Sequence, residues 1–350
     1  MIGQPWHTLG MRFRRYLISF AALASLAFAP SDAPAQTLSF DAYMQLVAAK
    51  ARAQGVDERS INTVLAGLTP SQRVIALDRD NTTSPNNAGF PPLAPYLSSH
   101  NTSARVAGGR RAYQQLGPLA AQVEQRYGVP ASIVLAIWGH ETSYGAVRGN
   151  FDLAQALATL AWEGRRRELF ETELIDLMKM VQQGVPRSRL VGSWAGAFGN
   201  PQFLPSIYLR LAVDADGDGL RNIWDSRADT LYSIANYFRD AGWRAGQPWG
   251  VRAYVPANLN RAALQNPMRP PNCPRVYVRH SKWKTVREWR ALGVIPQGTI
   301  GEDVMASLFE PDGAAAPGYL LTQNYRVILE YNCSNYYAMS VGLLADEIAR

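Results

Sequence analysis

Apolar residues recur at helical spacing along most of the 350-residue chain, in segments separated by stretches rich in glycine, proline and asparagine. Positions i, i+3 and i+4 share one face of a helix, so this spacing predicts amphipathic helices. We expect helices in residues 36–75, between short turns in 104–183, in 228–243 and in a last segment over 334–349. Residues 319–331 alternate apolar and polar positions, which predicts a short hairpin, and the proline-rich stretch 245–300 predicts irregular structure. The pattern indicates a mainly α fold with a small β element near the C-terminus.

One predicted helix carries an acid on its apolar face. Pro130 suits the first helical position, Ile133, Ile137 and Glu141 follow on one stripe, and Gly145 suits the end of the helix. A carboxyl on an apolar face loses its water, which raises its pKa and lets it hold a proton near neutral pH. Glu141 is therefore a candidate general acid. The alternative is a core glutamate that an arginine or a helix N-terminus satisfies.

The first 35 residues have the pattern of a secretory signal peptide. Arg12, Arg14 and Arg15 form a basic region, an apolar run follows over 16–29, and residues 33–35 are Ala-Pro-Ala, which suits cleavage. The run is too short to span a membrane comfortably, although an uncleaved anchor is the alternative. No cysteine follows it, so a lipoprotein is not expected. We expect an exported, periplasmic protein.

The formal net charge is +7 and falls to +5 when cleavage after residue 35 removes three arginines and one aspartate. A basic exported protein favours an anionic partner, such as a wall polymer or a membrane surface. No basic tract interleaved with aromatic residues is present, so nucleic acid is not an expected partner. The alternative is that mild basicity only keeps the protein soluble.

The chain has two cysteines, Cys273 and Cys333. An even count in an exported chain favours a disulfide. This bridge would close a loop of about 60 residues and contribute roughly 4 kcal/mol in the chain-entropy model. Two buried free thiols are the alternative.

The stretch "GSWAGAFGNPQFLPS" (192–206) combines small, polar and aromatic residues. Its small residues let the backbone approach a ligand closely. Ser193 and Gln202 could contact sugar hydroxyls and amides, and Phe203 offers a flat face to a pyranose ring. Close packing of helices through the small residues is the alternative.

Residues 214–225 contain the first half of an EF-hand loop, D-x-D-G-D-G. Alternating acids supply hard oxygen ligands to Ca²⁺, and a glycine permits the sharp turn. The candidate ligands are the carboxylates of Asp214, Asp216 and Asp218, the carbonyl of Leu220, and Asp225 at the twelfth position. Asp225 is one methylene shorter than the usual glutamate, which weakens bidentate closure. The alternatives are an acidic turn without a metal, or Asp225 as the cap of the next helix.

Taken together, these motifs resemble the bacterial lytic murein transglycosylases of the membrane-bound B type, which have a lysozyme-like catalytic core. The matching segments occur in the family's order: "ETSYG" (141–145), "ALATLAW" (156–162), "RRRELFETEL" (165–174), 192–206, "DADGDGLRNIWDS" (214–226), "SIANYFRDAGW" (233–243) and "YNCSNYYAMSVGLLADEI" (331–348). The resemblance implies one catalytic region over 36–350. This region comprises a helical part (36–120), the lysozyme-like core with its EF-hand-like loop (121–245), and an irregular or β part with a C-terminal helix (246–350).

The resemblance also implies roles for individual residues. Glu141 would be the lone acid and base. The residues at positions that contact the glycan are Tyr144, Arg165, Arg166, Ser193, Gln202, Phe203, Tyr237, Tyr331, Asn332 and Tyr337. Asp229 is the alternative to Asp225 for closing the metal loop. The chain departs from the family at Gln155, where relatives usually have Asp, and in 245–300. Its run of three arginines leaves the register of the arginine pair open by one residue.

The implied reaction cleaves the bond between N-acetylmuramic acid and N-acetylglucosamine without water and leaves 1,6-anhydromuramic acid ends. The implied partners are peptidoglycan glycan strands, with other cell-wall enzymes as candidates, and the implied state is a monomer with structural Ca²⁺ and no organic cofactor. A muramidase, which hydrolyses the same bond, is one alternative. A non-catalytic wall-binding protein is the other, although binding alone has no need of a desolvated acid.

Overall fold

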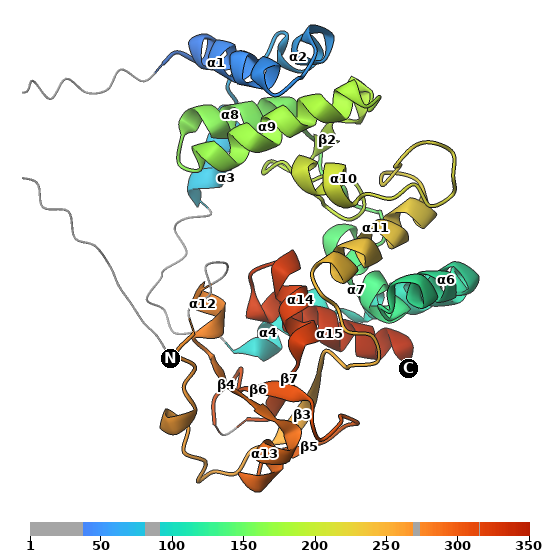
Figure 1. The fold of residues 1–350 in the computed structure, drawn as a ribbon, viewed down its shortest axis with the longest axis vertical. Coiled ribbons are helices and arrows are strands. Elements are labelled where there is room, and N and C mark those ends of the chain that lie inside the picture. Colours follow the sequence, from blue (N-terminus) through green and yellow to red (C-terminus); the bar gives the residue numbers. More distant parts are fainter. Residues whose placement is uncertain (1–37, 81–91, 269–273, 315) are drawn as a thin grey trace, which may run out of the picture. The chain divides into compact units, whose positions relative to one another are not determined.

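Helix α7 (Ala131–Thr142), which carries Glu141, packs against α5 (Ser103–Gln115), α6 (Gly117–Tyr127), α11 (Arg227–Asp240) and α15 (Asn335–Ala349). The computed structural model describes residues 38–80, 92–268, 274–314 and 316–350 (Figure 1). Every α7 residue from Ala131 to Gly139 is buried, so α7 is a core helix and not an amphipathic one. Pro130 is its N-cap and stands one position before the predicted start.

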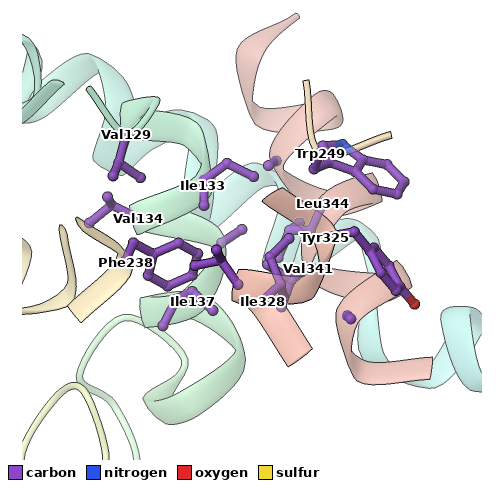
Figure 2. Close-up of a cluster of buried hydrophobic side chains, with 14 of the residues drawn as sticks. Val129, Ile133, Val134, Ile137, Phe238, Trp249, Tyr325, Ile328, Val341 and Leu344 are labelled. Carbon is purple, nitrogen blue, oxygen red and sulfur yellow. The ribbon is translucent and has the colours of Figure 1, made fainter. Parts of the chain in front are cut away.

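The first hydrophobic core surrounds α7. Ile133 and Ile137 lie in one buried cluster with Phe238 of α11, Ile328 of α14 (Gln323–Tyr331) and Val341 of α15 (Figure 2). Helix α4 (Leu93–His100) packs on α15. Burial of each such side chain contributes roughly 1.5–3 kcal/mol, so the helix that carries Glu141 is held firmly along its length.

A second core is formed by helices from two separate stretches of sequence. They are α1 (Phe40–Ala53), α2 (Glu58–Leu65), α3 (Gln72–Asp80), α8 (Leu153–Glu163), α9 (Arg167–Gln182) and α10 (Pro205–Leu211). Helix α9 packs against α1, α2, α8 and α10. The short strands β1 (Phe151–Asp152) and β2 (Val191–Gly192) pair antiparallel beside α8. The stretch 192–206 follows β2, and its Phe198 and Phe203 belong to this core.

Five antiparallel strands form a sheet with its own small core around Trp289. The strands are β3 (Gly250–Tyr254), β4 (His280–Thr285), β5 (Ile295–Pro296), β6 (Met305–Phe309) and β7 (Gly318–Leu321), in the order β4-β6-β7-β3-β5. Between them lie α12 (Pro274–Tyr277), α13 (Val286–Ala291) and a 3-10 turn (Ala262–Leu264); a second such turn is Arg187–Arg189. The prediction of irregular structure over 245–300 is therefore wrong for much of that stretch.

The predicted hairpin over 319–331 is also wrong. Strand β7 ends at Leu321, and the side chain of Thr322 then accepts a hydrogen bond from Asn324 N and caps α14. The buried residues Tyr325, Ile328 and Leu329 have the spacing i, i+3 and i+4, which is helical. The alternation seen in the sequence is thus a strand end followed by a helix.

The remaining expectations about organisation have mixed outcomes. The mainly α class is confirmed, and residues 39–350 form one compact unit. The division into three parts stays a prediction, and the predicted signal peptide lies outside the described residues. None of the described helices is long and apolar enough to cross a membrane. Cys333 is disulfide-bonded, whereas Cys273 lies outside the described residues, so their pairing stays a prediction.

Candidate active site

The last turn of α7 presents Glu141. The helix ends at Thr142, three residues before the predicted stop, because the backbone turns left-handed over Ser143, Tyr144 and Gly145 at φ 50°, 61° and 90°. Such values are uncommon for residues other than glycine. The turn directs the chain away from α7 immediately after the acid.

The carboxyl of Glu141 is partly buried and accepts a hydrogen bond at Oε1 from the hydroxyl of Tyr337 on α15. Burial raises the pKa of Glu141 to about 7, although the hydrogen bond from Tyr337 favours the charged form and acts in the opposite direction. Burial likewise raises the pKa of the Tyr337 hydroxyl well above its ordinary value, so it remains a donor. No carboxylate among the described residues contributes to the Glu141 shift.

Asn200, in the stretch 192–206, holds the same turn of α7 from one side. Its buried amide oxygen accepts a hydrogen bond from the indole of Trp138 at 3.1 Å, and its carbonyl accepts one from the Thr142 hydroxyl at 3.2 Å. The amide nitrogen donates to the carbonyl of Trp224 at 3.0 Å. Asn200 therefore connects Glu141's helix to the stretch 192–206. The sequence analysis missed this residue, and its only signal was its place inside the quoted motif.

Three predicted aromatic residues from different elements lie together. The Tyr331 ring at the end of α14 meets the Tyr237 ring of α11 edge-on, with 4.7 Å between the ring centres. The centre of the Phe203 ring lies 6.0 Å from that of Tyr237 and 6.2 Å from that of Tyr331. The Tyr331 hydroxyl donates to the carbonyl of Pro201 at 2.6 Å, and that of Tyr237 to the carbonyl of Glu330 at 2.7 Å. We name Phe203, Tyr237 and Tyr331 the aromatic cluster. Burial places the pKa of Tyr331 well above its ordinary value.

Ser193 and Gln202 shape the backbone of the stretch 192–206. The Ser193 hydroxyl accepts a hydrogen bond from Ala197 N at 3.0 Å, and the Gln202 amide donates to the Gly199 carbonyl at 2.9 Å. Gln202 is left-handed at φ 52°. Gly192 is required for the close approach of the chain to itself, because a Cβ there would lie 2.2 Å from the carbonyl oxygen of Ala197. Asn332, another predicted contact residue, is exposed at the C-cap of α14.

The arginine pair is anchored by an aspartate that the sequence analysis missed. Arg165 Nε donates to Asp78 Oδ2 at 2.7 Å, and Arg166 donates to Asp78 Oδ1 at 2.8 Å. Asp78 is 1% exposed on α3, while 37% and 38% of the arginine side chains stay exposed. Burial alone would raise the pKa of Asp78, but the arginine hydrogen bonds outweigh it and lower that pKa. No local pattern could have indicated this partner, which lies 87 residues before Arg165.

Tyr144 is partly buried and contacts the neighbouring helices, and its predicted glycan contact stays a prediction. Its hydroxyl donates to the carbonyl of Arg105 on α5 at 2.9 Å, and its ring meets Trp138 edge-on at 5.8 Å. The hydroxyl is therefore engaged by the backbone. Burial raises its pKa to about 12.

In the acidic loop, carboxylate oxygens of Asp214, Asp216 and Asp229 lie within 4.8 Å of one another. Asp229 is fully buried, and burial raises its pKa although Ala215 N and Asn222 N donate to it at 2.8 and 2.6 Å. The described residues place no ion pair on any of the three. Of the two candidates for closing the loop, Asp229 joins this group.

The other predicted ligands lie outside the group of three. Asp225 forms ion pairs with Arg148, at 3.1 Å, and with Arg189, which lower its pKa. Of the two alternatives for closing the loop, this engagement favours Asp229 over Asp225, and the choice stays a prediction. The Asp218 carboxylate accepts a hydrogen bond from Leu220 N at 2.7 Å, and the Leu220 side chain is 59% exposed.

Comparisons with known proteins agree with this architecture. A family model described as the transglycosylase SLT domain matches residues 39–346. The chain is 33% identical over 305 residues to membrane-bound lytic murein transglycosylase B of Escherichia coli K12, covering 84% of this chain and 79% of that protein. Its fold is similar to that of SltB3 from Pseudomonas aeruginosa in complex with NAG-anhNAM-pentapeptide. For this pair the TM-score is 0.78 and the identity 37%, over 89% of this chain and 80% of the other.

A further solved relative is an Escherichia coli lytic transglycosylase, SLT35, in complex with calcium. The TM-score is 0.71 and the identity 30%, over 87% of this chain and 91% of that chain. These likenesses confirm the expected lysozyme-like fold class and the resemblance drawn from the motifs. The chain belongs to the transglycosylase SLT family of lytic transglycosylases, enzymes that act on peptidoglycan.

Proposed function

We propose that Glu141 performs both proton transfers with which this lytic transglycosylase cleaves peptidoglycan. The observation that carries the proposal is the setting of its carboxyl: it lies at the end of a buried helix and bonds to the Tyr337 hydroxyl, with a pKa of about 7. A catalytic acid works best when its pKa lies near the working pH, because it then both holds and releases a proton. Glu141 meets this condition.

In the first step, neutral Glu141 gives its proton to the glycosidic oxygen between N-acetylmuramic acid and N-acetylglucosamine as that bond breaks. The Tyr337 hydroxyl, which donates to Oε1, stabilises the carboxylate that results. In the second step, this carboxylate takes the proton of the muramic acid 6-hydroxyl, and the 6-hydroxyl oxygen bonds to the anomeric carbon. The acid is regenerated, and the product carries a 1,6-anhydro ring.

Among the described residues, Glu141 accepts its side-chain hydrogen bond from a hydroxyl and no carboxylate contributes to its raised pKa, and both observations favour ring closure over hydrolysis. Hydrolases that invert place a second carboxylate about 6.5–9.5 Å from the acid to activate water, and retaining ones place a nucleophile at about 5 Å. The 6-hydroxyl is tethered to the reacting sugar and so has a high effective concentration. The resemblance implies that the substrate's own acetamido group stabilises the anomeric carbon. The anhydro sugar bound by the Pseudomonas aeruginosa enzyme supports this product.

We assign glycan contacts to the aromatic cluster, whose rings come from the stretch 192–206, α11 and α14. The flat apolar faces of aromatic rings pack well against the faces of pyranose rings that carry C–H groups. Ser193 and Gln202 give the neighbouring backbone its shape, and Asn332 is exposed for polar contact. Arg165 and Arg166 keep more than a third of their side chains exposed and would meet anionic groups of the stem peptide.

For the acidic loop we propose structural calcium. Asp214, Asp216 and the buried Asp229 fit this ion, because three clustered carboxylates that have no ion pair among the described residues repel one another until a cation binds. Ca²⁺ accepts oxygen ligands in irregular geometry, whereas Mg²⁺ demands a near-ideal octahedral shell, so this group of carboxylates favours Ca²⁺. The calcium complex of the Escherichia coli relative supports the proposal. When bound, the ion would supply charge neutralisation to the loop and no chemistry to the reaction.

The calcium proposal is tested by thermal melting in chelator and with millimolar Ca²⁺. A ligand that binds only the folded state raises the melting temperature, so Ca²⁺ should raise it and Mg²⁺ should have little effect. Asp214→Ala should abolish the response, while Asp303→Ala, at an exposed position far along the chain, should retain it. An unchanged melting temperature of the wild type in chelator and in Ca²⁺ would contradict the proposal.

We further propose that residues 1–35 direct export to the periplasm and that the protein acts as a monomer on glycan strands. Action on glycan strands is supported by two relatives: SltB3 is in complex with NAG-anhNAM-pentapeptide, and the Escherichia coli relative is named a lytic murein transglycosylase. Other cell-wall enzymes remain candidate partners.

The products test the proposed reaction directly. Purified sacculi are digested with the full-length enzyme, and released muropeptides are analysed by mass spectrometry with and without borohydride reduction. We expect muropeptides one water lighter than those of a muramidase, with no reducible end. Mainly reducible muramic acid ends would show a hydrolase, and an unchanged sacculus would show a binding protein.

A further inference from the structure

The ring of Tyr144 sits in a cradle of three glycines on two helices. A Cβ added to Gly108 of α5 would lie 2.8 Å from a Tyr144 ring carbon. One added to Gly139 of α7 would lie 2.6 Å from the carbon that bears the hydroxyl, and one on Gly109 would lie 2.6 Å from the hydroxyl oxygen. These distances are shorter than real contacts of side-chain carbons, so only glycine at these positions leaves room for the ring.

The cradle holds a turn that its own residues disfavour. Ser143 and Tyr144 are both left-handed, at φ 50° and 61°. Residues other than glycine persist in such conformations when their surroundings determine them. For Tyr144 these surroundings are the glycines, the Arg105 carbonyl that accepts from its hydroxyl at 2.9 Å, and the edge of the Trp138 ring.

The turn follows Glu141 by two residues, and the helix end before it is held from two directions. Asn200 accepts a hydrogen bond from the Trp138 indole at its side-chain amide oxygen and one from the Thr142 hydroxyl at its backbone carbonyl. Tyr144 ties the residues after the helix to α5, and its own N–H donates to the Trp138 carbonyl at 3.3 Å. Glu141 lies between Trp138 and Tyr144 in the sequence, in the helical turn that these hydrogen bonds hold. A shift of that turn would move the carboxyl relative to the bound sugar.

We propose that Tyr144, seated on Gly108, Gly109 and Gly139, is a positioning residue that sets the orientation of Glu141 in the cleavage reaction. This inference rests on the proposed role of Glu141. It gives Tyr144 an internal role in place of the predicted glycan contact, and it makes α5 a support of the active site although α5 lies outside the motifs that indicated the reaction.

Gly108→Ala tests the inference, because the three nearest atoms that the added Cβ would meet all belong to the Tyr144 ring. An alanine in mid-helix ordinarily stabilises a helix relative to glycine, so a loss of function here is specific to the cradle. With a soluble tetrasaccharide of alternating N-acetylglucosamine and N-acetylmuramic acid, we expect kcat to fall at least about tenfold and KM to change little. The matched control is Gly117→Ala on α6, where an added Cβ meets nothing within 4 Å and kcat should stay that of the wild type.

A double-mutant cycle separates positioning from general destabilisation. Tyr144→Ala removes the ring that the new methyl would strike, so Gly108→Ala should have no further effect on kcat in that background. Tyr144→Phe keeps the ring and should retain most of kcat. The alkaline limb of the pH profile of kcat/KM should move in Gly108→Ala, because a displaced Glu141 meets a different amount of water.

Each outcome decides the inference. Wild-type kcat and pH profile in Gly108→Ala, or the same loss of kcat with and without the Tyr144 ring, would overturn it. If Gly108→Ala does not fold, Tyr144→Phe and Tyr144→Ala are compared instead, and equal kcat values in these two variants would overturn it. The proposed function fails separately: it is lost if Glu141→Gln keeps its activity, whatever the cradle variants do.

Discussion

Glu141 at the end of α7 and Asp78 at the end of α3 are both carboxyls withdrawn from water, but their neighbours differ. Glu141 meets an uncharged hydroxyl from Tyr337, and burial raises its pKa to about 7. Asp78 meets two guanidinium groups, from Arg165 and Arg166, and its pKa is lowered in spite of burial. A buried acid without a cation becomes a proton donor, and one between two cations becomes a permanent anion.

This difference separates the two regions by purpose. At α7 the protein holds an acid that is neutral below about pH 7, which is the state that the proposed reaction requires. At α3 the anion holds two long arginine side chains in place. They therefore lose less conformational entropy when they bind a ligand. We interpret the first region as the chemical centre and the second as a preorganised support.

The largest effect in this comparison is expected at Glu141. Glu141→Gln is nearly isosteric but cannot donate and retrieve a proton, so release of muropeptides from sacculi should fall at least about 100-fold while the melting temperature stays close to that of the wild type. The matched control is Glu173→Gln, since Glu173 is also a buried glutamate but accepts its hydrogen bonds from Ser206 N and Oγ. The assigned role is wrong if Glu141→Gln retains more than a few per cent of the wild-type rate, or if both variants lose activity equally.

The two regions also differ in how far the sequence predicts them. Glu141 was identified from the apolar stripe through Ile133 and Ile137 together with the motif around it, because helical spacing and local motifs are properties of contiguous residues. Asp78, Asn200 and Arg105 were missed. Each acts through a partner in another element, and nothing in the local pattern of a residue records such a pairing.

The same limit applies to the fold. The helices were predictable where apolar spacing was regular, as in α1, α11 and α15. The small β element predicted near the C-terminus is confirmed, but its individual strands were not predicted, because they are short and pair over long separations, such as Gly250 with Leu321. Trp289 is fully buried in the core of that sheet, and a tryptophan in a proline-rich stretch does not indicate which surface it meets.

The next effect concerns stability against pH. The pKa of Glu141 is about 7 in the folded protein and about 4.3 in an unfolded chain, so between these values the folded state binds the extra proton and stability falls as pH rises. Glu141→Gln lacks this loss. Its free energy of unfolding relative to the wild type should therefore increase by roughly 2–3 kcal/mol from pH 5 to pH 8. Denaturant unfolding at both pH values measures this change, and a constant difference would contradict the raised pKa.

The smallest effect is expected at Asp78, where the fold stabilises the charged form of the carboxyl and not, as at Glu141, the neutral form. Asp78→Asn keeps the shape of the side chain but leaves Arg165 and Arg166 without their anion. Loss of one partner of a buried ion pair is strongly destabilising, but both arginines are more than a third exposed, so water replaces part of the interaction and we expect a loss of about 1–2 kcal/mol. The lowered pKa of Asp78 also predicts a pH dependence: its contribution to stability is present above its unfolded pKa and is lost as the pH falls through the folded pKa.

The control is Asp303→Asn, which breaks an exposed ion pair with Arg287 and should change stability by less than about 0.5 kcal/mol. Equal losses of stability in the two variants would mean that the ion pairs of Asp78 contribute no more than an exposed ion pair. The contrast between the two carboxyls would then rest on Glu141 alone.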